Sequence, residues 1–251
     1  MQAAMTQRDL MFRKFQIMKF NRKKMAPAVT MTINVDASQI LKLKDNLNNQ
    51  SSDASHITVT HIIMKAVASA LMQYPILYSF FNGKDIVENK ELILNIPVDV
   101  ESHVEYIVIH SPESKSLAEI AAECHEELNS IHSGNGTFMK FLLSFNKMSM
   151  VRKIIHFCGP NGAIRFLREG YGNFPLSNFG SFHINSGAVA ISRPMIAGLC
   201  IGVIAKEQER KSIPLTLTFD HRAVDGAYAG KFLYDVKTLL EQSDPIISDR
   251  K

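Results

Sequence analysis

The sequence predicts an α/β fold, in which strands and helices follow one another within one chain. Residues 213–219 alternate apolar and polar side chains, which is the period-two pattern of a strand with one buried face. Residues 29–36 show the same alternation near the start of the chain. After the later strand, apolar residues recur at helical spacing over residues 227–240, so this strand passes directly into a helix.

His221 stands at the junction between that strand and that helix. Asp225 and Gly226 follow as a turn signal, and we expect Gly226 to permit a sharp turn into the helix. Rigid elements on both sides would hold the imidazole, whose unperturbed pKa is the closest to neutral pH of any side chain. A lone histidine near a strand end is more often solvated than catalytic, so its position alone does not decide its role.

The composition is that of an ordinary globular protein. A chain of 251 residues suits one large domain or two small ones, with room for a substantial core. The hydrophobic fraction is 46% and the charged fraction is 21%. The net charge of +4 suits a polyanionic ligand but does not require nucleic acid.

The cysteines favour a reducing compartment, and the hydropathy favours a protein without a membrane span. Cys124, Cys158 and Cys200 are far apart and lack metal-ligand spacing, so we expect buried thiols and no metal. No apolar run approaches the length that spans a bilayer, and the N-terminus lacks a secretory signal. We therefore expect a cytoplasmic protein that binds neither membranes nor nucleic acid.

Residues 1–25 are predicted to form a basic N-terminal arm or helix. Lys and Arg alternate with apolar residues over positions 8–25, a pattern that also occurs in helices lying on membrane surfaces. Few such segments bind lipid, and we favour an arm packed on the protein. The remainder, 26–251, would form a single domain.

The elements between the two ends follow from periodicity, caps and breakers. In chain order they are the strand 29–36, a helix 38–47 capped by Asp36 to Ser38, a loop 48–53, a helix from Thr58 or Thr60 to Tyr74 stopped by Pro75, a strand 80–82 with a turn 83–84, strands 92–100 and 104–109, a helix 117–131 capped by Ser116, and short strands 188–191 and 199–204 joined through Pro194. His125 and His132 lie on or just after the helix 117–131, where we expect them to face solvent rather than bind metal.

The most specific motif is Phe-Asp-His-Arg-x-x-Asp-Gly, at residues 219–226. It resembles the active-site motif of the acyltransferase (E2) catalytic domain of 2-oxoacid dehydrogenase complexes. Chloramphenicol acetyltransferase shares that fold and has a related His-x-x-x-Asp-Gly signature. The resemblance implies a chloramphenicol acetyltransferase-like fold, a mixed β-sheet flanked by helices with the motif histidine on a loop at a strand end.

A second segment of the same family corresponds to residues 170–180. It resembles Thr-Ile-Ser-Asn-Leu-Gly, with Pro175 and Leu176 in place of Thr-Ile, and the family's oxyanion-stabilising serine corresponds to Ser177. Without the resemblance, a serine in this glycine-rich stretch would be interpreted as a turn residue.

The resemblance covers nearly all of the chain, with two departures. An atypical insertion at about 138–169 resembles free-standing E2-like proteins more than complex-bound cores. Residues 101–104 replace the Gly-Leu and Pro-Val that line the substrate channel in the family, so the resemblance does not define the identity of the acceptor.

The resemblance implies a coenzyme A-dependent acyltransferase that moves an acyl group between coenzyme A and a thiol acceptor of the lipoyl kind. His221 would be the general base, Ser177 would hydrogen-bond the oxyanion, and Asp225 would hold the active-site loop, with Arg13 as its candidate partner. Coenzyme A or acyl-coenzyme A would be a substrate. No lipoyl domain or subunit-binding domain is expected in this chain, so no lipoyl group would be bound to it.

The family also implies a homotrimer with active sites between subunits, and a separate lipoyl-carrying protein as a partner. Two other functions stay open. One is an acetyltransferase that acts on a small hydroxyl compound, and the other is a binding or assembly protein that retains the fold without turnover. Intact His221, Asp225 and Ser177 argue against the second of these.

Overall fold

The computed structural model describes residues 11, 27–50, 56–100, 103–147, 167–168, 170–207 and 210–242. The predicted N-terminal arm lies outside these residues, apart from Met11. The same holds for Cys158 and for most of the predicted insertion.

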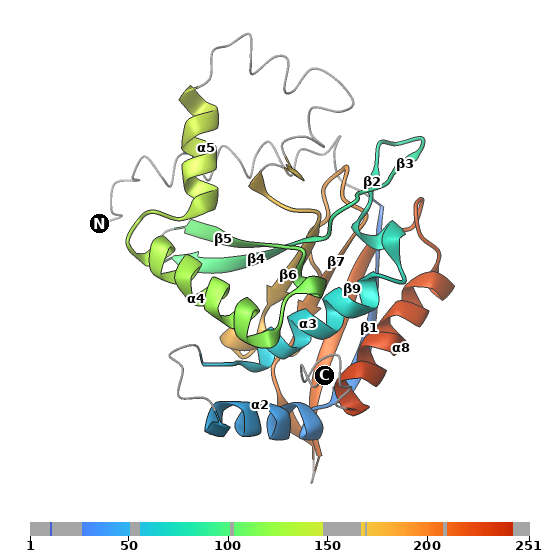
Figure 1. The fold of residues 1–251 in the computed structure, drawn as a ribbon. Coiled ribbons are helices and arrows are strands. Elements are labelled where there is room, and N and C mark those ends of the chain that lie inside the picture. Colours follow the sequence, from blue (N-terminus) through green and yellow to red (C-terminus); the bar gives the residue numbers. More distant parts are fainter. Residues whose placement is uncertain are drawn as a thin grey trace, which may run out of the picture.

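A mixed sheet forms the centre of the molecule (Figure 1), as predicted. Its strand order is β1-β9-β7-β6-β4-β5, and β8 pairs with β9. Strand β6 runs parallel to both of its neighbours, whereas the other pairs are antiparallel. The strands are β1 (Ala28–Asp36), β4 (Ile93–Val100), β5 (His103–His110), β6 (Phe174–Asn178), β7 (Ala197–Ile201), β8 (Ala205–Glu207) and β9 (Arg210–Asp220), with a separate hairpin of β2 (Phe80–Phe81) and β3 (Ile86–Val87).

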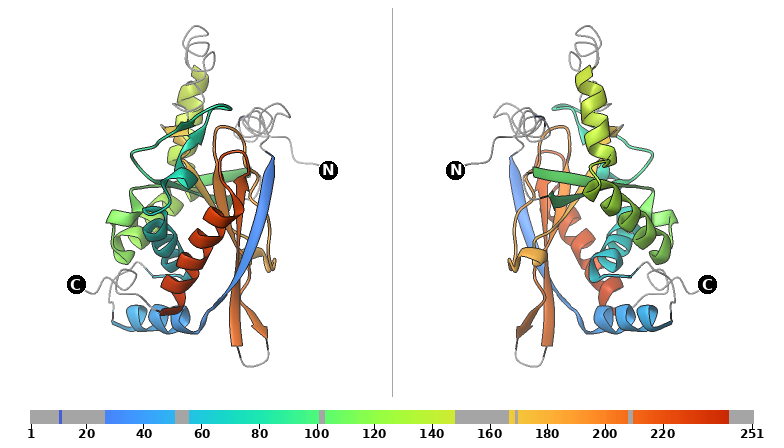
Figure 2. Two further views of the ribbon diagram at one scale, coloured as in Figure 1. Left: turned by 90° about the vertical axis from the view of Figure 1, so that its right-hand side faces the viewer. Right: turned by 90° about the vertical axis from the view of Figure 1, so that its left-hand side faces the viewer.

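Four helices cover one face of the sheet. Figure 2 shows α2, α3, α4 and α8 on one side of β1 and β9. Strand β1 follows this arrangement, because Thr30, Thr32 and Asn34 are exposed while Met31, Ile33 and Val35 point inward. The helices are α2 (Ser38–Gln50), α3 (Val59–Leu71), α4 (Leu117–His132), α5 (Thr137–Lys147) and α8 (Gly226–Gln242). No helix within the described ranges is long and apolar enough to cross a membrane.

Side-chain caps fix the starts of two of these helices. Thr58 caps α3 and Ser116 caps α4, each as part of a capping box with the residue three positions later, His61 and Glu119 respectively. Each box satisfies backbone N–H groups that have no partner within the helix. The cap at Ser116 agrees with the prediction, and Thr58 is one of the two predicted starts of α3.

Two apolar clusters stabilise the sheet from opposite faces. The larger joins the inner face to α2, α3, α4 and α8, and includes Leu94, Leu176 and Leu217. The smaller lies under α5, where the rings of Tyr106 and Phe138 meet edge to face at a centroid distance of 4.7 Å. Cys124 and Cys200 are buried and free, as predicted.

Several predicted boundaries were wrong, and one of them is the end of α3, which lies at Leu71 and not at Tyr74. Residues 188–191 form no strand, because they cross the outer face of β9, where the Val189 N–H donates to Thr218 Oγ1 at 3.2 Å. Strand β7 ends at Ile201, before the predicted end at 204. Helix α2 continues to Gln50, through residues predicted as a loop. The predicted exposure of His125 and His132 is confirmed.

Candidate active site

The loop that follows β9 is built around Asp220, whose side chain is completely buried. Its carboxylate accepts hydrogen bonds from the Arg222 backbone N–H at 3.0 Å and from Arg222 Nε at 2.9 Å, and it also pairs with Nη2. The Asp220 carbonyl accepts from the N–H groups of Ala223 and Val224, at 3.0 and 3.1 Å. One buried residue therefore holds the backbone of the three residues that follow His221.

Arg222 also holds the loop through a contact with the β2–β3 hairpin. Its guanidinium lies over the Phe81 ring, 5.1 Å from the centroid, which is the geometry of a cation–π contact. The hydrogen bond that Arg222 donates to the Asp220 carboxylate raises the pKa of Arg222, so the guanidinium stays charged. The loop is thus tied both to the end of β9 and to the β2–β3 hairpin.

His221 is exposed at the tip of this anchored loop. Its backbone N–H donates to Pro27 O at 3.3 Å, and its ring lies 5.8 Å from that of Phe219. The backbone is therefore fixed while the imidazole is open to a substrate. The predicted position of His221 at a strand-to-helix junction is confirmed.

Asp225 caps helix α8. Its Oδ1 accepts from the Tyr228 N–H at 2.8 Å, and its carbonyl accepts from the Ala229 N–H at 3.2 Å. Its candidate partner Arg13 lies outside the described residues. The expectation for Gly226 was wrong: it is the first residue of α8 and is not among the described glycines with positive φ.

Ser177 lies within strand β6, not in a turn, and the residue is 7% exposed. It is paired with Cys200 of β7. The next residue, Asn178, donates from Nδ2 to Thr60 Oγ1 at 2.9 Å, and so ties the end of β6 to the first turn of α3. This strand is thereby held from both the sheet and the helical layer.

The structure does not bring Ser177 and His221 together within one chain. Ser177 is in register with Cys200, and Cys200 with Thr216 of β9, while His221 lies five residues beyond Thr216. A residue advances about 3.4 Å along a strand and neighbouring strands are about 4.8 Å apart. The two side chains are therefore separated by roughly 20 Å along the sheet.

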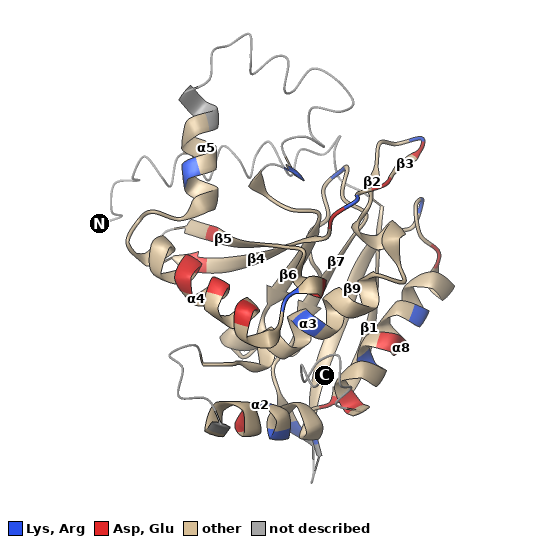
Figure 3. Cartoon of the chain, in the orientation of Figure 1, with Lys and Arg blue, Asp and Glu red and all other residues tan. Residues whose placement is uncertain are grey.

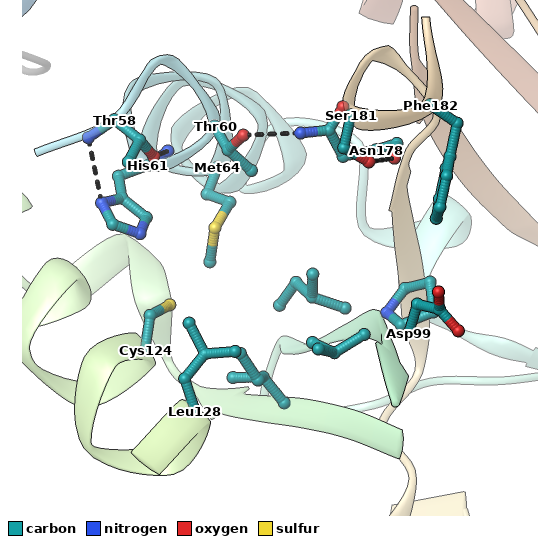
Figure 4. A pocket seen from close by; sticks show the side chains of 14 residues that line it. Thr58, Thr60, His61, Met64, Asp99, Cys124, Leu128, Asn178, Ser181 and Phe182 are labelled. Carbon is teal, nitrogen blue, oxygen red and sulfur yellow. Dashed lines mark hydrogen bonds between the residues drawn. The ribbon is translucent and has the colours of Figure 1, made fainter. Parts of the chain in front are cut away.

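A cavity of about 450 Å³ opens at the end of β6, between α3, α4 and β4 (Figure 4). Met64, Cys124 and Leu128 point toward its centre, and Asn178 and Phe182 close one side. Sequence reasoning missed this cavity, because strands and helices far apart in the chain form it and no local motif marks it.

His61 lines the same cavity as a neutral imidazole. Burial lowers its pKa to about 4, with further lowering by His56 and His125. Its Nδ1 accepts the Thr58 N–H at 3.3 Å, which fixes the orientation of the ring. At neutral pH this side chain therefore brings no positive charge to the cavity.

The described cysteines are poorly suited to act as nucleophiles. Burial raises the pKa of Cys124 to about 12, with a further increase from Glu123, and burial also raises the pKa of Cys200. Both are therefore thiols at neutral pH, and the thiol is the unreactive form. Within the described ranges, no group of three or more His, Cys, Asp or Glu side chains is placed to hold a metal ion.

Comparison with known families and curated proteins gives consistent matches. The family model described as 2-oxoacid dehydrogenases acyltransferase (catalytic domain) matches residues 10–139 and 168–247, leaving the stretch between them unmatched. The chain is 26% identical over 229 residues to the dihydrolipoyllysine-residue acetyltransferase component of the acetoin cleaving system of Bacillus subtilis, covering 87% of this chain and 50% of that protein. It is 28% identical over 233 residues to the corresponding component of the pyruvate dehydrogenase complex of Mycoplasma capricolum, covering 88% and 46%. The chain thus spans about half the length of the curated relatives it matches.

Solved structures show the same fold. The cubic core of the pyruvate dehydrogenase multienzyme complex superposes with a TM-score of 0.76 at 20% identity, covering 98% of this chain and 93% of that one. A probable dihydrolipoamide acetyltransferase of Listeria monocytogenes gives 0.74 at 23% identity, covering 96% and 94%. A chloramphenicol acetyltransferase gives 0.50 at 14% identity, covering 94% and 96%. The predicted fold class is confirmed.

Proposed function

Because the chain belongs to the acyltransferase catalytic-domain family of the 2-oxoacid dehydrogenases, we propose that it transfers an acyl group between coenzyme A and a thiol acceptor. The observation that carries this proposal is His221, an exposed imidazole on a loop that the buried Asp220–Arg222 pair immobilises. A base of this kind is what a thiol acceptor requires, because the thiolate is the nucleophile and the thiol is not.

In the proposed reaction, His221 takes the proton from the acceptor thiol. The thiolate attacks the thioester carbonyl and forms a new C–S bond. The Ser177 hydroxyl donates to the oxygen that becomes negative in the tetrahedral intermediate, and such donors contribute roughly 3–4 kcal/mol where they have been removed. The C–S bond to coenzyme A then breaks, and the imidazolium returns the proton to the departing sulfur.

This chemistry needs two copies of the chain. A reacting carbonyl within hydrogen-bond reach of Ser177 is roughly 20 Å from His221 of the same chain, when positions are counted along the sheet. We therefore propose a homotrimer in which His221 of one subunit faces Ser177 of the next. Exposed apolar side chains beside β6 support a contact there, because Phe182 is 57% and Ile184 is 48% exposed.

The acceptor is proposed to be a lipoyl group on a separate protein. The support is the name of the relatives, which are dihydrolipoyllysine-residue acetyltransferase components. Coenzyme A or acyl-coenzyme A is a substrate in this proposal, and Asp225 orders the loop by capping α8. The free buried thiols of Cys124 and Cys200 fit a reducing, cytoplasmic setting.

A second candidate is acetyl transfer to a small hydroxyl compound. It is favoured by the departure of residues 101–104 from the family sequence that lines the substrate channel. Acetyl transfer to a hydroxyl substrate, without activity on dihydrolipoamide, would select this second candidate. A binding protein without turnover would bind coenzyme A and exchange no acyl group.

The deciding experiment measures coenzyme A released from acetyl-coenzyme A, by chromatography, with dihydrolipoamide as the acceptor. His221→Ala is expected to abolish release, while His125→Ala, which removes an exposed histidine from α4, leaves it unchanged. Wild-type protein that binds coenzyme A and releases none would rule out the thiol acceptor. Equal loss in both histidine variants would rule out His221 as the base.

A further inference from the structure

The cavity of about 450 Å³ lies where two strands of the sheet separate. Strands β4 and β6 are paired at Leu94–Phe174 and Asn95–Pro175 and not beyond. Four successive residues of β4, 96–99, line the cavity, although their side chains alternate between the two faces of the sheet. The cavity therefore runs along the edge of β4 that β6 leaves open.

This opening adjoins the proposed oxyanion site. Asn178, the residue that follows Ser177 on β6, lines the cavity. Pro97 of β4 lines it from the other strand. A group attached to a carbonyl at Ser177 can thus extend past Asn178 into this space.

The lining of the cavity is mainly apolar, with hydrogen-bonding groups from the start of α3 and from the end of β6. Met64, Ile107, Cys124 and Leu128 form its floor, and the Asn178–Thr60 pair closes the side next to β6. None of the described residues that line it is Lys or Arg.

The charge around the cavity is unfavourable for an anion. One lining residue, Asp99, is acidic, and His61 is neutral at neutral pH. Figure 3 shows acidic positions along the adjacent helix α4. A phosphate, or a carboxylate at the end of an acyl chain, would be repelled here and would find no cationic partner among the lining residues.

We propose that this cavity binds the acyl chain of the thioester, and that it prefers uncharged chains of about four to eight carbons to acetyl or to acyl groups with a terminal carboxylate. This proposal rests on the proposed acyl transfer. An acetyl methyl group would leave nearly all of the space unfilled. A chain of eight carbons, at roughly 30 Å³ for each heavy atom, occupies about half of it.

The test measures binding, so that it does not depend on turnover. The full chain is titrated by calorimetry with coenzyme A thioethers that carry S-ethyl, S-butyl and S-hexyl groups. Each buried methylene is expected to tighten binding by about fourfold. A thioether ending in a carboxylate, matched in length to S-butyl, is expected to bind at least tenfold more weakly than S-butyl.

A variant within the cavity supplies the second comparison. Leu128→Trp fills the space and is expected to remove the gain from longer chains, whereas Asn129→Trp places the same ring on the exposed face of α4 and leaves the gain intact. The chain has no tryptophan, so the emission of the new indole reports whether it is buried. If Leu128→Trp does not fold, Leu128→Ala enlarges the cavity instead and is expected to shift the preference toward longer chains.

The two proposals fail in different ways. Equal affinity for S-ethyl, S-butyl and S-hexyl thioethers would overturn the acyl-chain cavity and leave coenzyme A binding in place. A longer-chain preference that survives in Leu128→Trp would also overturn it, since the chain would then bind elsewhere. Failure of every thioether, and of coenzyme A itself, would overturn the proposed function and this inference together.

Discussion

Asp220→Asn is the substitution that most directly tests how the active-site loop is held. Asp220 is fully buried and accepts three hydrogen bonds from Arg222, one from the backbone and two from the guanidinium. Removing one partner of a buried ion pair costs about 3–5 kcal/mol, because the remaining charge is uncompensated. The Arg222 side chain is 32% exposed, so water will solvate part of it. We therefore expect the unfolding free energy to fall by about 2–4 kcal/mol.

The measurement is urea unfolding followed by circular dichroism at one fixed protein concentration, since assembly makes apparent stability depend on concentration. Asp45→Asn is the control, because the Lys44–Asp45 pair is exposed and such pairs contribute roughly 0–1 kcal/mol. The double variant Asp220→Asn with Arg222→Met leaves no unpaired charge, and is expected to recover more than half of the loss.

The expected effect on activity follows from the same contacts. Without the carboxylate, the backbone at Arg222 loses an anchor and the orientation of His221 loosens, and a displacement of about 1 Å can lower a rate by about a hundredfold. We expect acyl transfer to fall by ten- to a hundredfold at a temperature where the variant is folded. A variant as stable and as active as the wild type would refute the role of this pair.

Three further predictions concern other parts of the chain. Asp225→Ala is expected to lower the unfolding free energy by about 1 kcal/mol through loss of the α8 cap, while Asp225→Asn retains most of the stability; equal losses in urea melts would contradict this. Because burial lowers the pKa of His61 to about 4 while the unfolded side chain titrates near 6.5, the unfolded chain takes up the proton first. The contribution of His61 to the unfolding free energy is complete above pH 6.5 and falls as the pH drops toward 4, by at most about 3 kcal/mol. His61→Gln is expected to remove this pH-dependent loss when melts at pH 7 and pH 4.5 are compared. Gly172→Ala is expected to cost about 1–3 kcal/mol, because Gly172 has a φ of 93° and an added Cβ would lie 2.9 Å from Ile93 O; an unchanged thermal midpoint would count against this.

The junction at His221 could be predicted because its signals are local. The alternation that ends at Phe219 and the helical spacing after Gly226 define both flanking elements without any tertiary information. The same kind of local signal gave a wrong prediction at residues 188–191. Their apolar run is typical of a strand, but the segment crosses β9, where the Val189 N–H donates to Thr218 Oγ1. Gly226 was likewise misread, because a glycine after an aspartate suggests a turn even where it begins a helix.

The candidate site was only partly accessible from the sequence. Ser177 was selected by resemblance, since a serine in a glycine-rich stretch has no distinguishing pattern of its own, and its strand became visible only through pairing with Cys200. The cavity beside it depends on where β4 and β6 cease to pair. Periodicity predicts that a strand exists, but it does not predict where its neighbour leaves it.

The separation of Ser177 and His221 has a genetic consequence. In a closed ring of three identical subunits, each proposed site takes its histidine from one copy and its serine from the next. A cell with two alleles, one altered at His221 and one at Ser177, would make two inactive proteins that assemble together. Random assortment places an intact histidine opposite an intact serine at about a quarter of the interfaces. Two null alleles would thus complement one another, whereas a heterozygote with one allele altered only at His221 would keep both residues intact at about half of its sites.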